Sequence, residues 1–239
     1  MARDPFLQQV VEEAIESRIP VGSTVLDIGC GDGRSTLRFA RRAAAITGVD
    51  YIPAFVEKAA AAARAEGVGN VRFLQADATA LTDRKAQIGA VDVAVSIRCL
   101  INLDSWDRQK AALRQIADMV KPGGLYLLSE GWDEGMEGLN ALRSRAGLPP
   151  IVPVPYNLTI SRKLFEKEIA GLFAVEEYVN LGFYIMMSRF VQPCAVYPEP
   201  PRHDHAINAL AAALQRECRD SPLFGSADYA GVYVLRRLG

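Results

Sequence analysis

The feature that most constrains this chain is the stretch VLDIGCGDGRST at residues 25–36, where an apolar run leads into glycines at positions 29, 31 and 33. Glycine weakens strand and helix interiors, so such a cluster is expected where the backbone turns sharply and lies close against another group. A glycine-rich turn directly after a first strand is a ligand site in doubly wound α/β folds. We call residues 29–33 the glycine turn.

Beyond this turn, short apolar runs alternate with helical patterns. Strands are predicted at residues 23–29, 45–50, 71–77, 91–97 and 125–130. Helices are predicted at 34–44, from Pro53 to an end at Gly67, and at 105–120, with a turn at 121–124. Runs that are apolar throughout are typical of strands buried on both faces. The alternation therefore predicts an α/β fold, with a doubly wound, mostly parallel sheet and helices on both faces.

After Glu130 the alternation breaks down. Helical patterns appear near 137–145, 162–170 and 204–217, and strand patterns at 172–182 and 231–238. Without an internal repeat or a low-complexity linker, we expect one domain over residues 1–239, with a ligand-binding core at about 20–135. The irregular segments, about 131–160 and 183–215, are expected to form a cap over the carboxyl edge of the sheet, where ligands bind in open α/β sheets. We call them the cap segments.

Composition excludes several classes of function. The formal net charge is -1 and the pI about 6.2, so no basic field indicates a nucleic acid partner. No run reaches the ~18 apolar residues of a membrane helix, so no membrane association is expected. The cysteines form no C-x-x-C pair, which predicts reduced thiols in a cytoplasmic protein, and with only two histidines no metal site is expected.

The spacing of the glycines narrows the class of ligand that the turn can bind. It is G-x-G-x-G, and Arg34 stands where the nicotinamide fingerprint G-x-G-x-x-G needs its last glycine. The lysine of a phosphate loop is also missing. Asp27, two residues before the first glycine, would repel a pyrophosphate but would suit the cationic end of a ligand. The missing glycine disfavours a nicotinamide oxidoreductase, and the missing lysine disfavours a phosphate loop.

With these motifs the chain resembles the class I S-adenosylmethionine-dependent methyltransferases over about residues 20–130. VLDIGCGDG is similar to the first motif of that family, GVD places Asp50 after the second strand, and QADA places Asp77 after the third. VDVAVS and VKPGGLYLLSE are similar to the fourth- and fifth-strand motifs. A finer resemblance, in RCLINL (98–103) and SRF (188–190), is to bacterial enzymes encoded among polysaccharide and small-metabolite genes. The resemblance implies a seven-stranded Rossmann-like sheet closed by the strands at 172–182 and 231–238.

The resemblance also implies S-adenosylmethionine as methyl donor, with S-adenosylhomocysteine as product. Asp50 is expected to bind the ribose hydroxyls, Asp77 with the Ala78 amide the adenine edge, and Asp27 the amino end of the donor. The alternatives are ordinary acids at strand ends for Asp50 and Asp77, and a capping role for Asp27. The predicted donor-site residues are Asp27, Gly29, Cys30, Gly31, Asp50, Tyr51, Asp77, Ala78, Ile97 and Arg98.

On the acceptor side, Glu130 is the candidate general base, because it ends the fifth strand beside the expected donor. Its alternative role is to cap or pair with a neighbouring loop. Polar residues within apolar segments are candidates for binding the acceptor, or equally for holding the cap segments to the core. They are Arg98, Asn102, Asn140, Arg143, Asn157 and Arg189, of which the three arginines would suit an anionic group.

The predicted function is methylation of a small polar metabolite or sugar derivative, on oxygen. An N-methyltransferase is the alternative, with Glu130, Asp133 and Glu134 holding a cationic amine. A donor-binding protein without transferase activity is a further alternative. A nucleic acid base methyltransferase is disfavoured, because SIRC follows the fourth strand where N-P-P-Y or a similar motif is often found. The expected partner is a small-molecule acceptor, and the apolar run at 183–191 leaves a homodimer possible.

Overall fold

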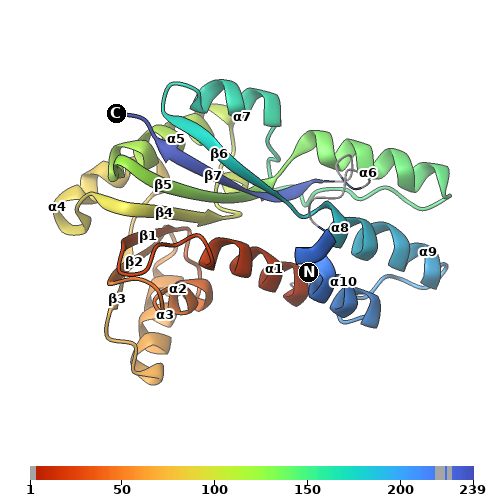
Figure 1. Cartoon of the computed structure of the whole chain (residues 1–239), viewed down its shortest axis with the longest axis horizontal. Helices are drawn as coiled ribbons and strands as arrows, with labels where there is room; N and C mark the ends of the chain where they lie inside the picture. Colours follow the sequence, from red (N-terminus) through yellow and green to blue (C-terminus); the bar gives the residue numbers. More distant parts are fainter. Residues whose placement is uncertain (1–3, 219–223, 225–227) are drawn as a thin grey trace.

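A computed structural model describes residues 4–218, 224 and 228–239 of the chain. Within these residues a seven-stranded sheet forms, with the strand order β3-β2-β1-β4-β5-β7-β6 (Figure 1). Strands β1 to β5 run parallel, and β7 is antiparallel to both β5 and β6. The predicted fold class is confirmed. The strands are β1 (Thr24–Ile28), β2 (Ala45–Asp50), β3 (Val71–Gln75), β4 (Val91–Ile97), β5 (Val120–Gly131), β6 (Phe173–Asn180) and β7 (Ala230–Arg237).

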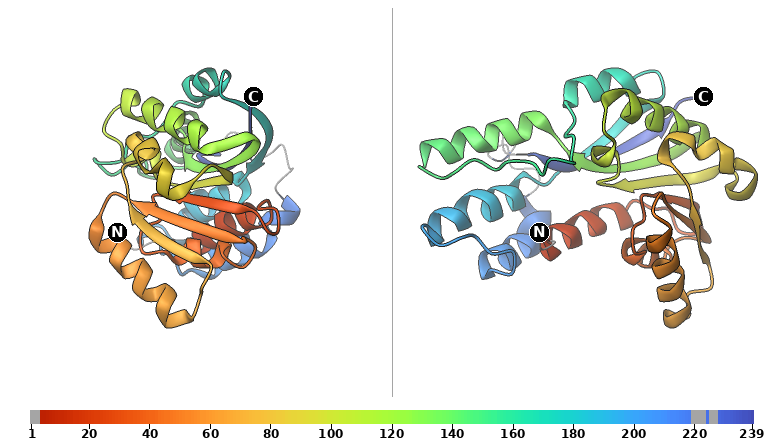
Figure 2. Two further views of the ribbon diagram at one scale, coloured as in Figure 1. Left: turned by 90° about the vertical axis from the view of Figure 1, so that its left-hand side faces the viewer. Right: turned by 180° about the vertical axis from the view of Figure 1, so that it is seen from behind.

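The helices cover both faces of this sheet (Figures 1 and 2). The ends predicted for two of them are confirmed: Gly67 ends α3 with a φ of 66°, and the Ser105 hydroxyl caps α5 by accepting from the Arg108 N–H. The α-helices are α1 (Pro5–Glu16), α2 (Arg34–Phe39), α3 (Pro53–Glu66), α4 (Lys85–Ile88), α5 (Trp106–Met119), α6 (Asp133–Arg145), α7 (Arg162–Ile169), α8 (Gly182–Met186), α9 (Gln192–Val196) and α10 (Ala206–Cys218). Short 3₁₀ segments η1 (Ala78–Arg84) and η2 (Leu100–Asn102) and a π-helical turn η3 (Met187–Val191) complete the set.

Strand periodicity divides the buried side chains of the described residues into two clusters. In β4, Ala94 points to the cluster that also holds α5 and α7, while Val93 and Val95 point to the cluster of α1, α2, α8 and α10. In β5 the same alternation separates Tyr126 from Leu127. Because successive side chains of a strand face opposite sides, a strand covered on both faces is mostly apolar. In β4 the two polar residues have partners: Asp92 accepts from Thr24 at the start of the strand, and the buried Ser96 hydroxyl shares a hydrogen bond with that of Tyr126.

Two local expectations, the turn at 121–124 and the extent of the helix at 34–44, are wrong. Residues 121–124, predicted as a turn, lie inside β5, where the pairing with β4 shifts between Val91 and Val93 to accommodate them. The helix predicted at 34–44 ends at Phe39. The apolar run at 183–191 is helical, and its Tyr184 and Ile185 are buried in the core of the same chain; a homodimer stays a prediction.

The cap segments extend beyond the sheet on the side to which the carboxyl end of β5 points. In Figure 1 and the right view of Figure 2, α6 continues from β5 along one side, and α8 to α10 lie along the other. Helix α1 packs against α10 and against α2, so it reaches from the cap to the helix that follows the glycine turn. Among the described helices, none combines the length and apolar character needed to cross a membrane.

Candidate functional site

The glycine turn follows β1 and is folded tightly against its neighbours. Gly29, Gly31 and Gly33 have φ values of 73°, 55° and 82°, a region that other residues rarely adopt. The N–H groups of Gly29 and Cys30 both donate to the Val49 carbonyl in β2, at 2.8 and 3.0 Å. A Cβ atom on Gly29 would lie 2.7 Å from the Cys99 sulfur, whereas one on Gly31 would meet nothing within 4 Å. The turn is therefore closed at Gly29 and open at Gly31.

Asp50, at the end of β2, joins that strand to the glycine turn. Its Oδ2 accepts from the Gly31 N–H at 2.9 Å and its Oδ1 from the Ile52 N–H at 3.0 Å. A carboxylate oxygen can accept more than one hydrogen bond, so each oxygen retains capacity for a ligand hydroxyl. Tyr51 beside it is 69% exposed, which leaves an aromatic surface next to the carboxylate.

Asp27 is buried beneath the glycine turn. Its Oδ2 accepts from the Thr36 hydroxyl at 2.5 Å, which connects β1 to α2. Burial raises the pKa of Asp27 to about 6; the Thr36 hydrogen bond opposes this, and the charges of Asp50 and Glu12 add to it. A cation held close to this carboxyl group would favour its ionised form.

Asp77 follows β3, and both of its carboxylate oxygens contact other residues of the chain. Its Oδ1 accepts from the Thr79 N–H and hydroxyl, both at 2.8 Å, and its Oδ2 forms an ion pair with Arg108 of α5 at 3.2 Å. These contacts match the alternative weighed for Asp77, an ordinary acid at a strand end, and adenine binding stays a prediction. Arg108 was not anticipated, because it lies in a different part of the chain and no motif marks it.

Glu130 lies at the carboxyl end of β5, where a base was expected, but its side chain turns toward the loop after β4. We call residues 98–102 the post-β4 loop. The Glu130 carboxylate accepts from backbone N–H groups of that loop and is 1% exposed. Burial raises the pKa of Glu130 to about 7, opposed by these hydrogen bonds and by the charge of Arg98. These contacts match the loop-capping alternative, and the role of base stays a prediction.

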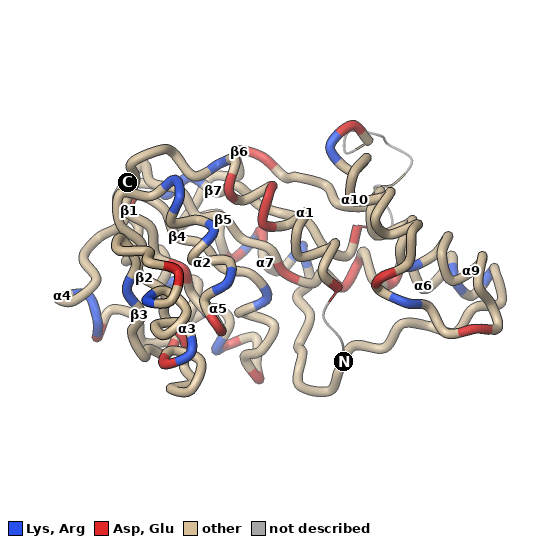
Figure 3. The backbone as a smooth tube through the Cα atoms, turned by 90° about the horizontal axis from the view of Figure 1, so that it is seen from below, with Lys and Arg blue, Asp and Glu red and all other residues tan. Residues whose placement is uncertain are grey.

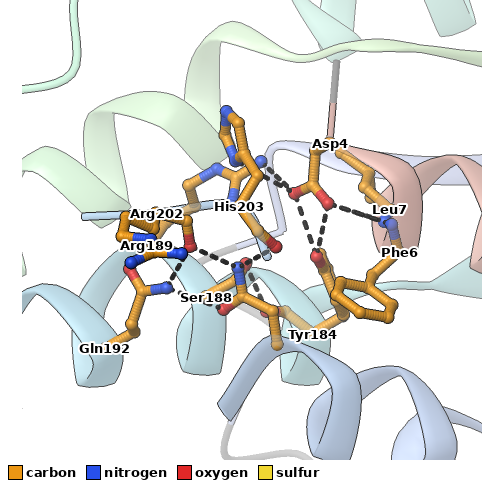
Figure 4. Close-up of polar contacts among 10 residues, drawn as sticks. Asp4, Phe6, Leu7, Tyr184, Ser188, Arg189, Gln192, Arg202 and His203 are labelled. Atoms are coloured by element: carbon orange, nitrogen blue, oxygen red, sulfur yellow. Dashed lines mark hydrogen bonds and ion pairs between the residues drawn. The ribbon is translucent and has the colours of Figure 1, made fainter. Parts of the chain in front are cut away.

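Two of the predicted acceptor-binding arginines, both in the cap segments, have partners within the chain. Arg143 donates to the carbonyl groups of Pro149 and Arg189. The Arg189 guanidinium forms an ion pair with Asp4 at 2.5 Å, and Asp4 also accepts from the Tyr184 hydroxyl (Figure 4). The Arg189 charge is therefore paired within the chain, and acceptor binding by Arg143 and Arg189 stays a prediction.

The predicted asparagines are also used in the fold. The Asn140 side chain exchanges two hydrogen bonds with the backbone of Ile151, and the Asn102 side chain donates to the Arg98 carbonyl. Asn157 is placed in a backbone turn, donating its N–H to Val154. The contacts of Asn140 and Asn157 lie within one cap segment and that of Asn102 within the post-β4 loop, and acceptor binding by the three residues stays a prediction.

Nowhere in the described part of the chain do three or more His, Cys, Asp or Glu side chains gather as metal ligands would. The four cysteines all lie among the described residues and are free; they are Cys30, Cys99, Cys194 and Cys218.

Comparisons with known proteins match the part of the chain that carries this site. Residues 25–124 match the family model described as a methyltransferase domain. The chain is 32% identical over 125 residues to the ubiquinone biosynthesis O-methyltransferase of Xanthomonas axonopodis pv. citri, covering 52% of this chain and 49% of that one. It is 40% identical over 74 residues to a 23S rRNA uracil methyltransferase of Pseudomonas aeruginosa strain UCBPP-PA14, covering 30% and 16%.

A solved structure extends the comparison to the whole fold. The N-methyltransferase NodS of Bradyrhizobium japonicum, in complex with S-adenosylhomocysteine, superposes with a TM-score of 0.58 at 14% identity, over 98% of this chain and 88% of that one. At this identity the likeness concerns the fold alone. The chain spans about half or less of the length of the curated relatives named above. The family match includes Asp27, Asp50 and Asp77 and ends before Glu130.

Proposed function

We propose that this chain, a member of the class I S-adenosylmethionine-dependent methyltransferases, binds S-adenosylmethionine at the glycine turn and methylates a small polar metabolite or sugar derivative on oxygen. The observation that carries the proposal is the geometry at Asp50. Its carboxylate bridges the ends of β1 and β2 and retains hydrogen-bonding capacity beside the open backbone at Gly31. The position, next to the point where the strand order reverses between β1 and β4, is where doubly wound sheets bind nucleotides.

The residues around the turn fit the chemistry of that donor. Asp50 would accept from the ribose hydroxyls, since both of its oxygens are acceptors. Asp77 would accept from the adenine amino group, sharing its Oδ2 with Arg108. Asp27 would favour the ammonium end of the methionine part, through the backbone of the turn or through water, because a nearby cation offsets the cost of burying its charge.

When bound, S-adenosylmethionine supplies a methyl group on a sulfonium sulfur that leaves as a neutral thioether. The work left to the chain is to align the acceptor atom with that methyl group. The post-β4 loop is the protein segment that packs against Gly29, so Arg98 and Cys99 would border the transfer side of the donor. A hydroxyl acceptor would also need a group to take its proton.

Contacts of the acidic residues support oxygen over nitrogen as the acceptor atom. A cationic amine would be held by Glu130, Asp133 and Glu134, but each carboxylate already accepts from donors of the chain. Asp133 accepts from the Thr159 hydroxyl, and Glu134 from the Ser161 hydroxyl and the Arg162 N–H. An amine would have to displace these donors, whereas a hydroxyl acceptor needs no carboxylate cluster.

An RNA acceptor is the alternative suggested by the ribosomal RNA relative. That match covers only 30% of this chain. The formal charge is -1, and Lys and Arg are interspersed with Asp and Glu along the backbone in Figure 3. Contacts of Lys and Arg with phosphates are the main source of affinity for nucleic acids, so a net charge of -1 and the short match favour a small molecule.

The proposal is tested by titrating S-adenosylhomocysteine into the wild-type chain and Asp50→Ala by calorimetry. We expect the variant to bind at least tenfold more weakly, equivalent to about 1.4 kcal/mol, with Asp83→Ala, an exposed acid of η1, as an unchanged control. Circular dichroism checks that Asp50→Ala is folded. Equal affinities in folded proteins, or no binding by the wild type, would refute the donor site.

The acceptor is then sought with methyl-labelled S-adenosylmethionine and a panel of metabolites bearing hydroxyl or amino groups. We expect a labelled ether, identified by mass spectrometry and NMR. A labelled amine as the only product would replace oxygen by nitrogen in the proposal while leaving the donor site intact.

A further inference from the structure

The post-β4 loop has a conformation that its own sequence does not favour. Arg98 has a φ of 53° and, among the described residues other than glycine, is alone in having a positive value. Residues with a side chain adopt this conformation only where the surrounding structure fixes it. Such positions are concentrated at ligand sites. Contacts from the surrounding structure must therefore hold the loop in this conformation.

The Glu130 carboxylate makes most of the contacts that hold the centre of the loop. Its Oε1 accepts from the N–H groups of Cys99 at 2.8 Å and Leu100 at 2.7 Å, and its Oε2 accepts from Ile101 at 3.4 Å. Successive N–H groups that converge on one carboxylate form an anion-binding turn. Both oxygens of Glu130 are thus directed into the loop rather than toward an acceptor.

Other contacts complete the arrangement at its two ends. The Arg98 N–H donates to the Ser129 carbonyl at 2.8 Å, and the Asn102 side chain donates to the Arg98 carbonyl at 2.6 Å. The buried Gln109 side chain donates to the Leu100 carbonyl at 3.1 Å. These three contacts position the ends and the outer side of the loop. The carboxylate of Glu130 binds its centre.

The loop is in turn part of the wall of the donor site. Gly29 approaches Cys99 so closely that a Cβ on the glycine would lie 2.7 Å from the sulfur and 2.9 Å from the Cys99 Cβ. A shift of Cys99 therefore changes the space beside the glycine turn. Glu130 acts on that space only through the backbone of the loop.

We propose that Glu130 is a positioning residue, whose carboxylate holds the strained post-β4 loop against Gly29 and thereby shapes the methyl-donor pocket. This rests on the proposed function, because the pocket is the one assigned to S-adenosylmethionine. It differs from the sequence-based expectation of a general base, which would have to touch the acceptor.

The experiment compares Glu130→Gln and Glu130→Ala. Glutamine retains an Oε1 that can accept from both Cys99 and Leu100 and alters only the longest of the bonds, the one to Ile101. Alanine removes all of them. We expect Glu130→Gln to bind S-adenosylhomocysteine within about threefold of wild type, and Glu130→Ala to bind it at least tenfold more weakly. Asp92→Ala is the matched control, because Asp92 also accepts a backbone N–H, from Thr24, but at the opposite end of β4.

Hydrogen exchange at residues 99–101 gives a readout independent of any ligand. These amides should exchange slowly in the wild type and in Glu130→Gln, and at least tenfold faster in Glu130→Ala. If Glu130→Ala does not fold, Glu130→Asp replaces it: the shorter side chain keeps the charge but not the reach, and the same two changes are expected. Unchanged exchange and unchanged affinity in Glu130→Ala or Glu130→Asp would overturn the proposal.

The remaining outcomes separate the two proposals and the two roles of Glu130. A wild type that binds no S-adenosylhomocysteine, yet shows the expected exchange pattern, would refute the donor site while leaving the loop contact intact. A Glu130→Gln variant that keeps wild-type affinity and exchange but loses turnover would make Glu130 the base and overturn the positioning role.

Discussion

Adding one methyl group at Gly29 or at Gly31 tests the packing of the glycine turn directly. Both residues have positive φ values, 73° and 55°, so alanine at either position carries the same conformational cost, about 1–2 kcal/mol. Only at Gly29 does the new Cβ overlap another side chain, Cys99, at 2.7 Å from its sulfur. Overpacking of this kind typically costs a further ~1–3 kcal/mol.

We therefore expect Gly31→Ala to lower the free energy of unfolding by about 1–2 kcal/mol and Gly29→Ala by about 2–5 kcal/mol. Urea denaturation followed by circular dichroism measures both. Cys99→Gly removes the sulfur and the Cβ and leaves the Cys99 Cα at 3.6 Å, an ordinary contact. In that background Gly29→Ala should cost no more than Gly31→Ala does in the wild type.

The result that refutes the reasoning is equal destabilisation by the two alanines with no coupling between positions 29 and 99. The double-mutant comparison cancels the cost that Cys99→Gly carries alone. Gly31→Ala adds a second check, because its methyl group would project into the space assigned to the donor. It should weaken S-adenosylhomocysteine binding even though it contacts nothing in the protein.

Two further predictions concern buried charge. The pKa of Glu130 is raised from 4.5 to about 7 by burial, so the stability this group contributes is complete below about pH 4.5 and is lost as pH rises through 7. As the pH rises between those limits, the free energy of unfolding of Glu130→Gln should increase relative to that of the wild type, by up to roughly 3 kcal/mol. Urea denaturation measures it, and a difference between the two proteins that does not change with pH would contradict the raised pKa. Asp4→Ala should lower the free energy of unfolding by about 3–5 kcal/mol, because it leaves the charge of Arg189 buried without a partner. Asp204→Ala is the control: it breaks the exposed ion pair with Arg202, and we expect no measurable change in stability. Equal effects of the two variants would show that the pair of Asp4 with Arg189 does not stabilise the fold.

The parallel part of the sheet is predictable because its signals are local. The run at 91–97 is mostly apolar, Gly67 ends a helix in the left-handed conformation, and Ser105 begins one. Each of these depends on neighbours within a few residues. The resemblance then supplies the seven-stranded sheet closed by the last two strands, which local patterns cannot give, and the structure confirms it.

The contacts of the polar site residues are not local, and this is why the sequence leaves their roles open. Glu130 and Leu100 are 30 residues apart, and they meet because β4 and β5 pair in one particular register. Arg189 and Asp4 are 185 residues apart, and their pairing depends on where α1 begins against the cap. A polar residue in an apolar segment indicates a buried partner, but the pattern does not say whether that partner is a ligand or the chain.

The turn expected at 121–124 fails for a related reason. Lys-Pro-Gly-Gly is typical of turns, and Gly123 does have a φ of 77°. The segment nevertheless continues β5, because Val120 pairs with Val91 before the irregularity and Leu125 pairs with Val93 after it. Turn residues here accommodate an irregular strand pairing rather than end the strand.

The measurement that most directly tests the central claim is thermal unfolding of the wild-type chain with S-adenosylmethionine, S-adenosylhomocysteine, NAD or NADP, each added alone. A ligand at ~100 times its dissociation constant stabilises the folded state by about 2.7 kcal/mol, which raises the midpoint by several degrees in a domain of this size. We predict this rise with the two sulfur-containing nucleosides and none with the nicotinamide dinucleotides. A rise with NAD or NADP alone would contradict the assignment of the glycine turn as a methyl-donor site.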